Sequence, residues 1–163
     1  MATKTSLSLM SAALRHLQDA EFLAGDDGTL PASSGGRPYQ SLNQTEHLVG
    51  FAPECARKAC LSTFWLDKLI SHDLSSSAED LLELAISLDA YATRYPIKNW
   101  PEVFPSITSW KPDVRYQQTT RKPDEVAALE RKVRDLLGEA KQAVDSVLIG
   151  LYVDGRLDPL GEL

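Results

Sequence analysis

Four residues in one short stretch could do chemistry on a phosphate. His47, Glu54, Arg57 and Lys58 combine an imidazole, a carboxylate and two cations. An imidazole can transfer a proton, and a cation can stabilise negative charge on a phosphate. The alternative is a surface ion pair between Glu54 and Lys58, four residues apart on a helix, with His47 as a polar packing residue. No second histidine stands at metal-ligand spacing from His47, so we expect neither a metal nor another cofactor.

Positive charge concentrates in the later part of the chain. The net charge is −6, which argues against indiscriminate nucleic-acid binding, yet Arg94 to Arg134 holds nine basic and five acidic residues. Aromatic residues between arginines and lysines can stack on bases or anchor a protein interface. The predicted binding residues are Glu54, Arg57, Lys58, Arg115, Tyr116 and Arg121. The alternative is that the aromatic side chains of this region only cover one end of the fold.

A long helix from Ser41 to His72 is predicted to position the first group of residues. Its apolar side chains fall in two adjacent stripes, and stripes that wide need neighbours on two sides. Small residues near its centre would let other helices approach closely. Pro53 removes one backbone hydrogen bond inside this helix, so a kink is predicted near Val49 to Pro53.

Three further helices are predicted around the central one, over residues 6–24, 78–95 and 124–153. The last has the clearest apolar repeat and a stop signal at Gly155. The helix over 78–95 is predicted to begin with a capping box that pairs Ser76 with Glu79, or Ser77 with Asp80. These elements indicate an all-α fold, an up-and-down four-helix bundle with a long proline- and aromatic-rich loop before its last helix. We expect the second and fourth helices to share the longest contact.

Several smaller expectations follow from the same pattern. Glu21 falls on the apolar stripe of the first helix, so it should reach the helix rim or meet a cation, with Arg57 and Lys58 as candidates. Residues 25–40 should form a loop, and the tail 155–163 should be extended and weakly docked. Cys55 and Cys60 point to different sides of one helix, too far apart for a disulfide, so both should be free.

Length and composition fit one domain over residues 1–163, since a chain of this size can bury a sufficient core without metal or disulfide. No apolar run approaches the roughly 20 residues of a membrane span. The cysteines are typical of buried residues in a reducing compartment. We therefore expect a cytoplasmic protein without a membrane partner.

The segments LRHLQDAEFL and HLVGFAPECARKACL carry a family resemblance. With Glu54-Cys55 followed by Lys58, and Arg115-Tyr116 after Trp110, the sequence resembles prokaryotic HEPN-domain proteins. These are small helical bundles of toxin–antitoxin and antiviral defence systems. The resemblance covers most of the chain and implies the four-helix bundle. The ribonucleases of the family use an arginine and a histidine separated by four to six residues near the last helix, usually in a dimer.

The chain departs from that ribonuclease pattern. Its histidines are His16, His47 and His72, and none follows residue 72. The resemblance is therefore to a branch without the usual motif, with no catalytic residues. It implies a non-catalytic HEPN-like module that binds a partner protein or a second copy of itself, a nucleotide or RNA. Two alternatives stay open: a HEPN-type ribonuclease with unorthodox residues, for which the first group above is the candidate, and a helical scaffold unrelated to nucleic acids.

Overall fold

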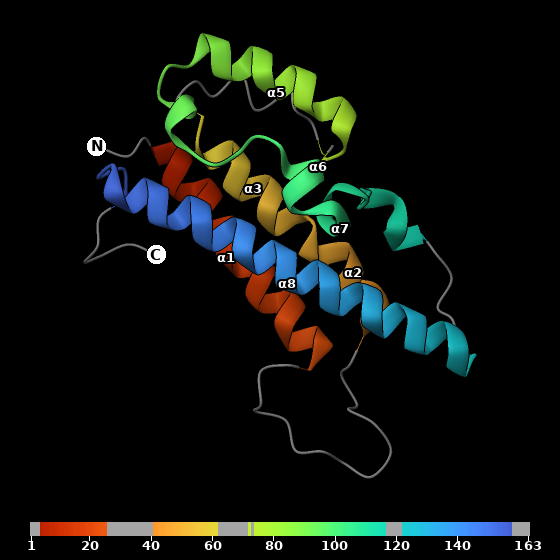
Figure 1. The fold of residues 1–163 in the computed structure, drawn as a ribbon. Helices are drawn as coiled ribbons and strands as arrows, with labels where there is room; N and C mark the ends of the chain where they lie inside the picture. The colour runs from red at the N-terminus through yellow and green to blue at the C-terminus, as the bar shows by residue number, and fades with distance from the viewer. Residues whose placement is uncertain (1–3, 26–40, 62–71, 73, 117–121, 158–163) are drawn as a thin grey trace.

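Every regular element in the described part of the chain is helical, which confirms the predicted all-α class (Figure 1). The computed structural model describes residues 4–25, 41–61, 72, 74–116 and 122–157. Its elements are α1 (Lys4–Ala24), α2 (Leu42–Val49), α3 (Phe51–Ala59), α5 (Ser76–Leu88), η1 (Ala92–Arg94), α6 (Trp100–Val103), α7 (Pro105–Thr108), η2 (Pro112–Tyr116) and α8 (Pro123–Val153). None of the described helices combines the length and the apolar character that a membrane span requires.

The predicted central helix is broken where proline interrupts its hydrogen bonds. α2 ends at Val49 and α3 begins at Phe51, because Pro53 has no N–H to donate to the Val49 carbonyl. The predicted kink at this position is confirmed. Gly50 is required at the junction, since a Cβ there would lie 2.0 Å from the Trp110 indole. The aromatic loop thus packs directly on the break.

The expected continuation of this helix to His72 is wrong. α3 ends at Ala59, and the next N–H groups, those of Cys60 and Leu61, bond three residues back instead of four. A distant residue takes part in this ending: the Arg156 guanidinium donates to the Cys60 carbonyl at 2.9 Å. Residues 62–71 lie outside the described part of the chain, and His72 occupies a turn.

The first helix, not the last, makes the most extensive contact with the α2–α3 pair. α1 packs along both α2 and α3, and α8 contacts each of them less extensively. The prediction that the second and fourth helices share the longest contact is therefore wrong. The reason lies in side-chain size: Ala13 and Ala20 of α1 and Ala52 and Ala56 of α3 are fully buried, so the backbones can approach closely.

α5 forms an outer layer above this core and ends earlier than expected (Figure 1). The predicted helix to Tyr95 stops at Leu88, because the buried Asp89 carboxylate accepts the N–H groups of Tyr91 and Ala92 and turns the chain into η1. The predicted capping box is also wrong. Ser75 is the N-cap, and the Glu79 carboxylate contacts other elements instead.

α8 agrees with the predicted 124–153 helix almost to the residue. It closes with Gly155 in the left-handed region at φ +65°, where the Gly155 N–H bonds the Tyr152 carbonyl and the Arg156 N–H bonds the Leu151 carbonyl, each at 2.9 Å. The prediction that the tail docks only weakly is wrong for the first residues of the tail. Arg156 is buried and also donates to Ser6 Oγ at 2.8 Å, so it ties the end of α8 to α1.

Three smaller predictions concern Glu21, the two cysteines and the aromatic loop. Glu21 does reach a cation at the surface, but the partner is Lys141 at 3.6 Å, not Arg57 or Lys58. The two cysteines are free, as expected. The proline- and aromatic-rich segment before α8 does bury aromatic side chains, since Trp100, Phe104 and Trp110 are all in the core. It also contains the short helices α6 and α7.

Candidate functional site

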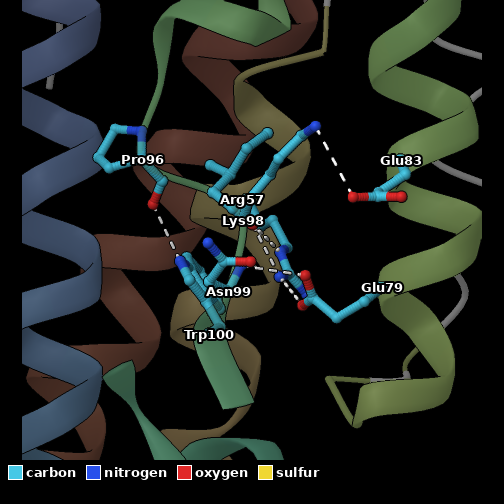
Figure 2. Close-up of polar contacts among 8 residues, drawn as sticks. Arg57, Glu79, Glu83, Pro96, Lys98, Asn99 and Trp100 are labelled. Carbon is cyan, nitrogen blue, oxygen red and sulfur yellow. Dashed lines mark hydrogen bonds and ion pairs between the residues drawn. The ribbon is translucent and has the colours of Figure 1, made fainter. Parts of the chain in front are cut away.

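Arg57, predicted to lie on a binding surface, is buried between three parts of the fold (Figure 2). Its Nε and Nη2 atoms donate to the Ile97 carbonyl at 3.0 and 2.7 Å, and Nη2 also donates to the Glu79 carboxylate. The guanidinium lies over the Trp100 ring, 4.3 Å from its centroid. Arg57 therefore joins α3 to α5 and to the loop between η1 and α6, and it belongs to the core.

Glu79 extends this network to the loop (Figure 2). Its second carboxylate oxygen accepts the Asn99 N–H at 3.2 Å, and Asn99 has a left-handed backbone at φ +59°. The Trp100 indole N–H donates to the Pro96 carbonyl at 2.9 Å. The ion pair between Arg57 and Glu79 thus holds α5 and the loop before α6 against α3, although both are far from Arg57 in the sequence.

Glu54 and Lys58 form the predicted pair, but not at the surface. Lys58 Nζ lies 2.7 Å from Glu54 Oε1, and both side chains are largely buried. The two carboxylate oxygens of Glu54 also lie 2.9 and 3.0 Å from His72 Nδ1. His72 is 60% exposed, so the buried carboxylate orients an imidazole at the surface.

All three histidines of the chain meet around Phe51. The ring centroids of His16, His47 and His72 lie 5.7, 5.1 and 5.9 Å from that of Phe51. We call these four residues, with Glu54 and Lys58, the Phe51 cluster. It draws side chains from α1, α2, α3 and the turn at residue 72. Trp110 covers the same ring at 5.0 Å and donates to the Glu46 carbonyl at 2.7 Å.

Burial lowers the pKa of two of these imidazoles. The pKa of His47 is lowered from its ordinary value of 6.5 first by burial, then by the positive charges of Arg115 and His16. The pKa of His16 is lowered by burial and by Arg15, against smaller opposing effects of Asp19 and Glu54. Burial also raises the pKa of the adjacent Cys55 thiol to about 11, so it is an unreactive group at neutral pH.

Two further predicted site residues lie in η2, which packs on α2. Arg115 and Tyr116 of η2 are both exposed, and the Arg115 guanidinium lies 4.6 Å from the centroid of the Tyr116 ring. Arg115 is near enough to His47 to affect its pKa. The structure thus brings Glu54, Lys58 and Arg115 to one region but separates Arg57 from it. Arg121 lies outside the described residues.

His16 and His72 were not among the site residues predicted from the sequence. His47 was a candidate from the sequence, and its contact with Phe51 could also have been inferred, because Phe51 follows it by four residues on what was expected to be one helix face. Within the described ranges, no group of histidine, cysteine, aspartate or glutamate side chains has a geometry that could hold a metal ion.

Comparison with known proteins adds no relative: no family model, no curated protein and no solved structure matches the chain. The resemblance to HEPN-domain proteins stays a prediction from the residues themselves.

Proposed function

We propose that the protein is a cytoplasmic HEPN-like module, built on a four-helix bundle, that binds single-stranded RNA without cleaving it in a prokaryotic defence or toxin–antitoxin system. The RNA would lie on the exposed side of the Phe51 cluster and on η2. The observation that carries the proposal is the gathering of all three histidines around Phe51, with the exposed Arg115 near one of them, His47. A nucleotide, a partner protein or a second copy of the chain are the other ligands that the resemblance implies.

The chemistry of η2 favours RNA among these ligands. Tyr116 is 74% exposed, and an exposed ring with a guanidinium against it can stack on a base. Such stacking contributes about 1–3 kcal/mol per base and tolerates any base, since every base has a π face. Arg115 can neutralise phosphate charge, which makes binding depend on salt.

The positions of Arg57 and Lys58 support binding without cleavage. Arg57 is buried against the Ile97 carbonyl and Glu79, and Lys58 is paired with Glu54. Neither of these two cations is free to stabilise charge on a scissile phosphate, which phosphodiester cleavage needs besides proton transfer.

Fluorescence anisotropy with a labelled single-stranded RNA tests the proposal. Replacing Arg115 by Glu and Tyr116 by Ala together should reduce affinity at least tenfold with little change in melting temperature, since both side chains are exposed. Arg134→Glu, the same charge reversal on the exposed side of α8, serves as the matched control and should bind nearly as well as wild type. Equal RNA affinity for the double variant and the control would disprove the proposed site.

A second candidate function, ribonuclease activity, is favoured by the contact between His72 and Glu54. A carboxylate that binds Nδ1 of a surface imidazole prepares Nε2 for proton transfer, and His47 contacts the same Phe51 ring. RNA degradation by the pure protein that disappears in both His72→Ala and His47→Ala would establish this function in place of the first. If the protein neither binds nor cleaves RNA, the remaining interpretation is a helical scaffold unrelated to nucleic acids.

A further inference from the structure

The two ring nitrogens of His47 have different surroundings. Nδ1 is buried and has no hydrogen-bond partner among the described residues. The residue as a whole is only half-buried. Its ring meets the Phe51 ring edge to face, with the centroids 5.1 Å apart and the planes at 87°. A ligand that arrives from solvent must therefore bind His47 through the other nitrogen, Nε2.

The burial of Nδ1 also decides where the proton of the neutral ring lies. A neutral imidazole carries one N–H and one lone pair. A buried N–H without an acceptor is rarer in proteins than a buried acceptor without a donor, so the lone pair belongs on Nδ1 and the proton on Nε2. His47 in its neutral form thus presents a hydrogen-bond donor on its accessible nitrogen.

The neutral form of His47 is favoured over the imidazolium for two reasons. Protonation would place a second N–H on Nδ1, where the described residues offer no acceptor. The pKa of His47 is lowered by burial first and then by the charges of Arg115 and His16. The ring is therefore mostly uncharged at about pH 7.5, since its ordinary pKa is already 6.5.

The charges around His47 favour an anionic ligand. Arg115 of η2 and His16 of α1 are the groups whose charges act on the ring, and both are basic. η2 also carries the exposed Asp113, which is not among the groups that shift this pKa. The acids of α2 and α3 are already paired with other groups: Glu46 with Lys132, and Glu54 with Lys58 and His72.

We propose that His47 binds a phosphate oxygen of RNA as a neutral donor, through Nε2–H, while Arg115 supplies the positive charge and Tyr116 stacks on the neighbouring base. Arg115 connects the two contacts, because η2 packs on α2 and the guanidinium lies 4.6 Å from the centroid of the Tyr116 ring. This role of His47 rests on the proposed function and adds a residue to its binding surface. A neutral ring with its proton on Nε2 has no lone pair there to act as a general base.

Two amide substitutions separate the two ring nitrogens. The glutamine side chain can place an N–H near the position of Nε2, whereas the shorter asparagine side chain reaches only as far as Nδ1. In fluorescence anisotropy with labelled single-stranded RNA at about pH 7.5, His47→Gln should bind within about threefold of wild type. His47→Asn and His47→Ala should bind at least about tenfold more weakly, the loss expected for a hydrogen bond to a charged group.

The two amide variants are controls for each other. Both remove the imidazole and its edge contact with Phe51, so a residue that only packs would give the same RNA affinity in both. Their melting temperatures, measured by circular dichroism, show whether each variant is folded at the temperature of the binding assay. Equal affinities of the folded glutamine and asparagine variants would overturn the proposal.

The protonation state is tested independently of the substitutions. Long-range ¹H–¹⁵N correlation NMR at about pH 7.5 should place the His47 proton on Nε2, with and without RNA. The RNA affinities of wild type and His47→Gln should change in parallel between about pH 7.5 and pH 6, because a neutral donor takes up no proton on binding. A proton on Nδ1, or an affinity that rises on acidification only in the wild type, would overturn the proposal.

Failure of this role can be distinguished from failure of the proposed function. If RNA binding is lost in the combined Arg115→Glu and Tyr116→Ala variant but kept in His47→Ala, the RNA site stands and the role of His47 is refuted. If the wild-type protein binds RNA at neither pH, both are refuted.

Discussion

Replacing Gly50 by alanine tests whether the aromatic loop is locked onto the break between α2 and α3. The backbone at Gly50 has φ −73° and ψ −22°, which alanine adopts readily, so any effect must come from the new methyl group. That methyl would lie 2.0 and 2.2 Å from two carbons of the Trp110 indole. The indole must move, and with it the hydrogen bond to the Glu46 carbonyl and the edge contact with Phe51.

The size of the effect follows from the burial of Trp110, which is 2% exposed. Complete loss of such a packed side chain typically costs about 3–5 kcal/mol. Alanine recovers about 0.5–1 kcal/mol through its higher helix propensity. We therefore expect Gly50→Ala to lower the free energy of unfolding by about 2–4 kcal/mol, measured by urea denaturation followed by circular dichroism.

The same substitution at Gly138 is the matched control and should have the opposite sign. Gly138 lies within α8, and a Cβ there would meet nothing within 4 Å. Gly138→Ala should raise the free energy of unfolding by about 0.5–1 kcal/mol. In a Trp110→Ala background the penalty at Gly50 should largely vanish, because the clashing atoms are gone. Gly50→Ala as stable as wild type, or a penalty that persists without the indole, would refute the reasoning.

Three further predictions concern the core and the histidines. Arg57→Met should destabilise the fold by about 3 kcal/mol in urea titrations, and Glu79→Gln by about 1–2 kcal/mol, because the first leaves a buried carbonyl and carboxylate without their donor; an Arg57→Met variant of wild-type stability would contradict the network. The lowered pKa values of His16 and His47 mean that the unfolded chain takes up protons first, so stability present above pH 6.5 should fall as the pH drops below it. The His16→Gln/His47→Gln variant should lose less stability between about pH 7 and pH 5, and an identical pH profile would exclude these groups as the cause. Ala59→Arg should prevent folding, because Ala59 is fully buried and the new charge would have no partner; a wild-type thermal transition would count against the packing described.

Local signals in the sequence predicted the helices that depend on local rules. The apolar repeat of α8 and the left-handed glycine after it gave both the extent and the ending of that helix, and Pro53 gave the kink. Each of these depends on residues within one or two turns, which a single sequence displays directly. The pairing of Glu54 with Lys58 was predictable for the same reason.

The candidate site was predicted only in part, because its geometry depends on distant segments. The sequence correctly predicted that Glu54 pairs with Lys58. It could not show that His72 contacts the same Glu54 carboxylate, or that His16 of another helix reaches Phe51. It also gave Arg57 a surface role. Arginine is usually exposed, and only its partners at Ile97 and Glu79 make a buried position tolerable.

The sequence by itself thus determined the all-α class, the last helix and the break at Pro53, because helix periodicity, glycine and proline act over a few residues. The tertiary structure decided where α3 ends, which histidines meet and which face of α5 is buried. Each of these outcomes depends on a contact between segments far apart in the chain: Arg156 on the Cys60 carbonyl, Phe51 against His16, and Glu79 on Arg57. A charged or aromatic side chain pairs with whichever partner the fold brings near it. The spacing of residues along the sequence does not show how far apart two such side chains lie in space.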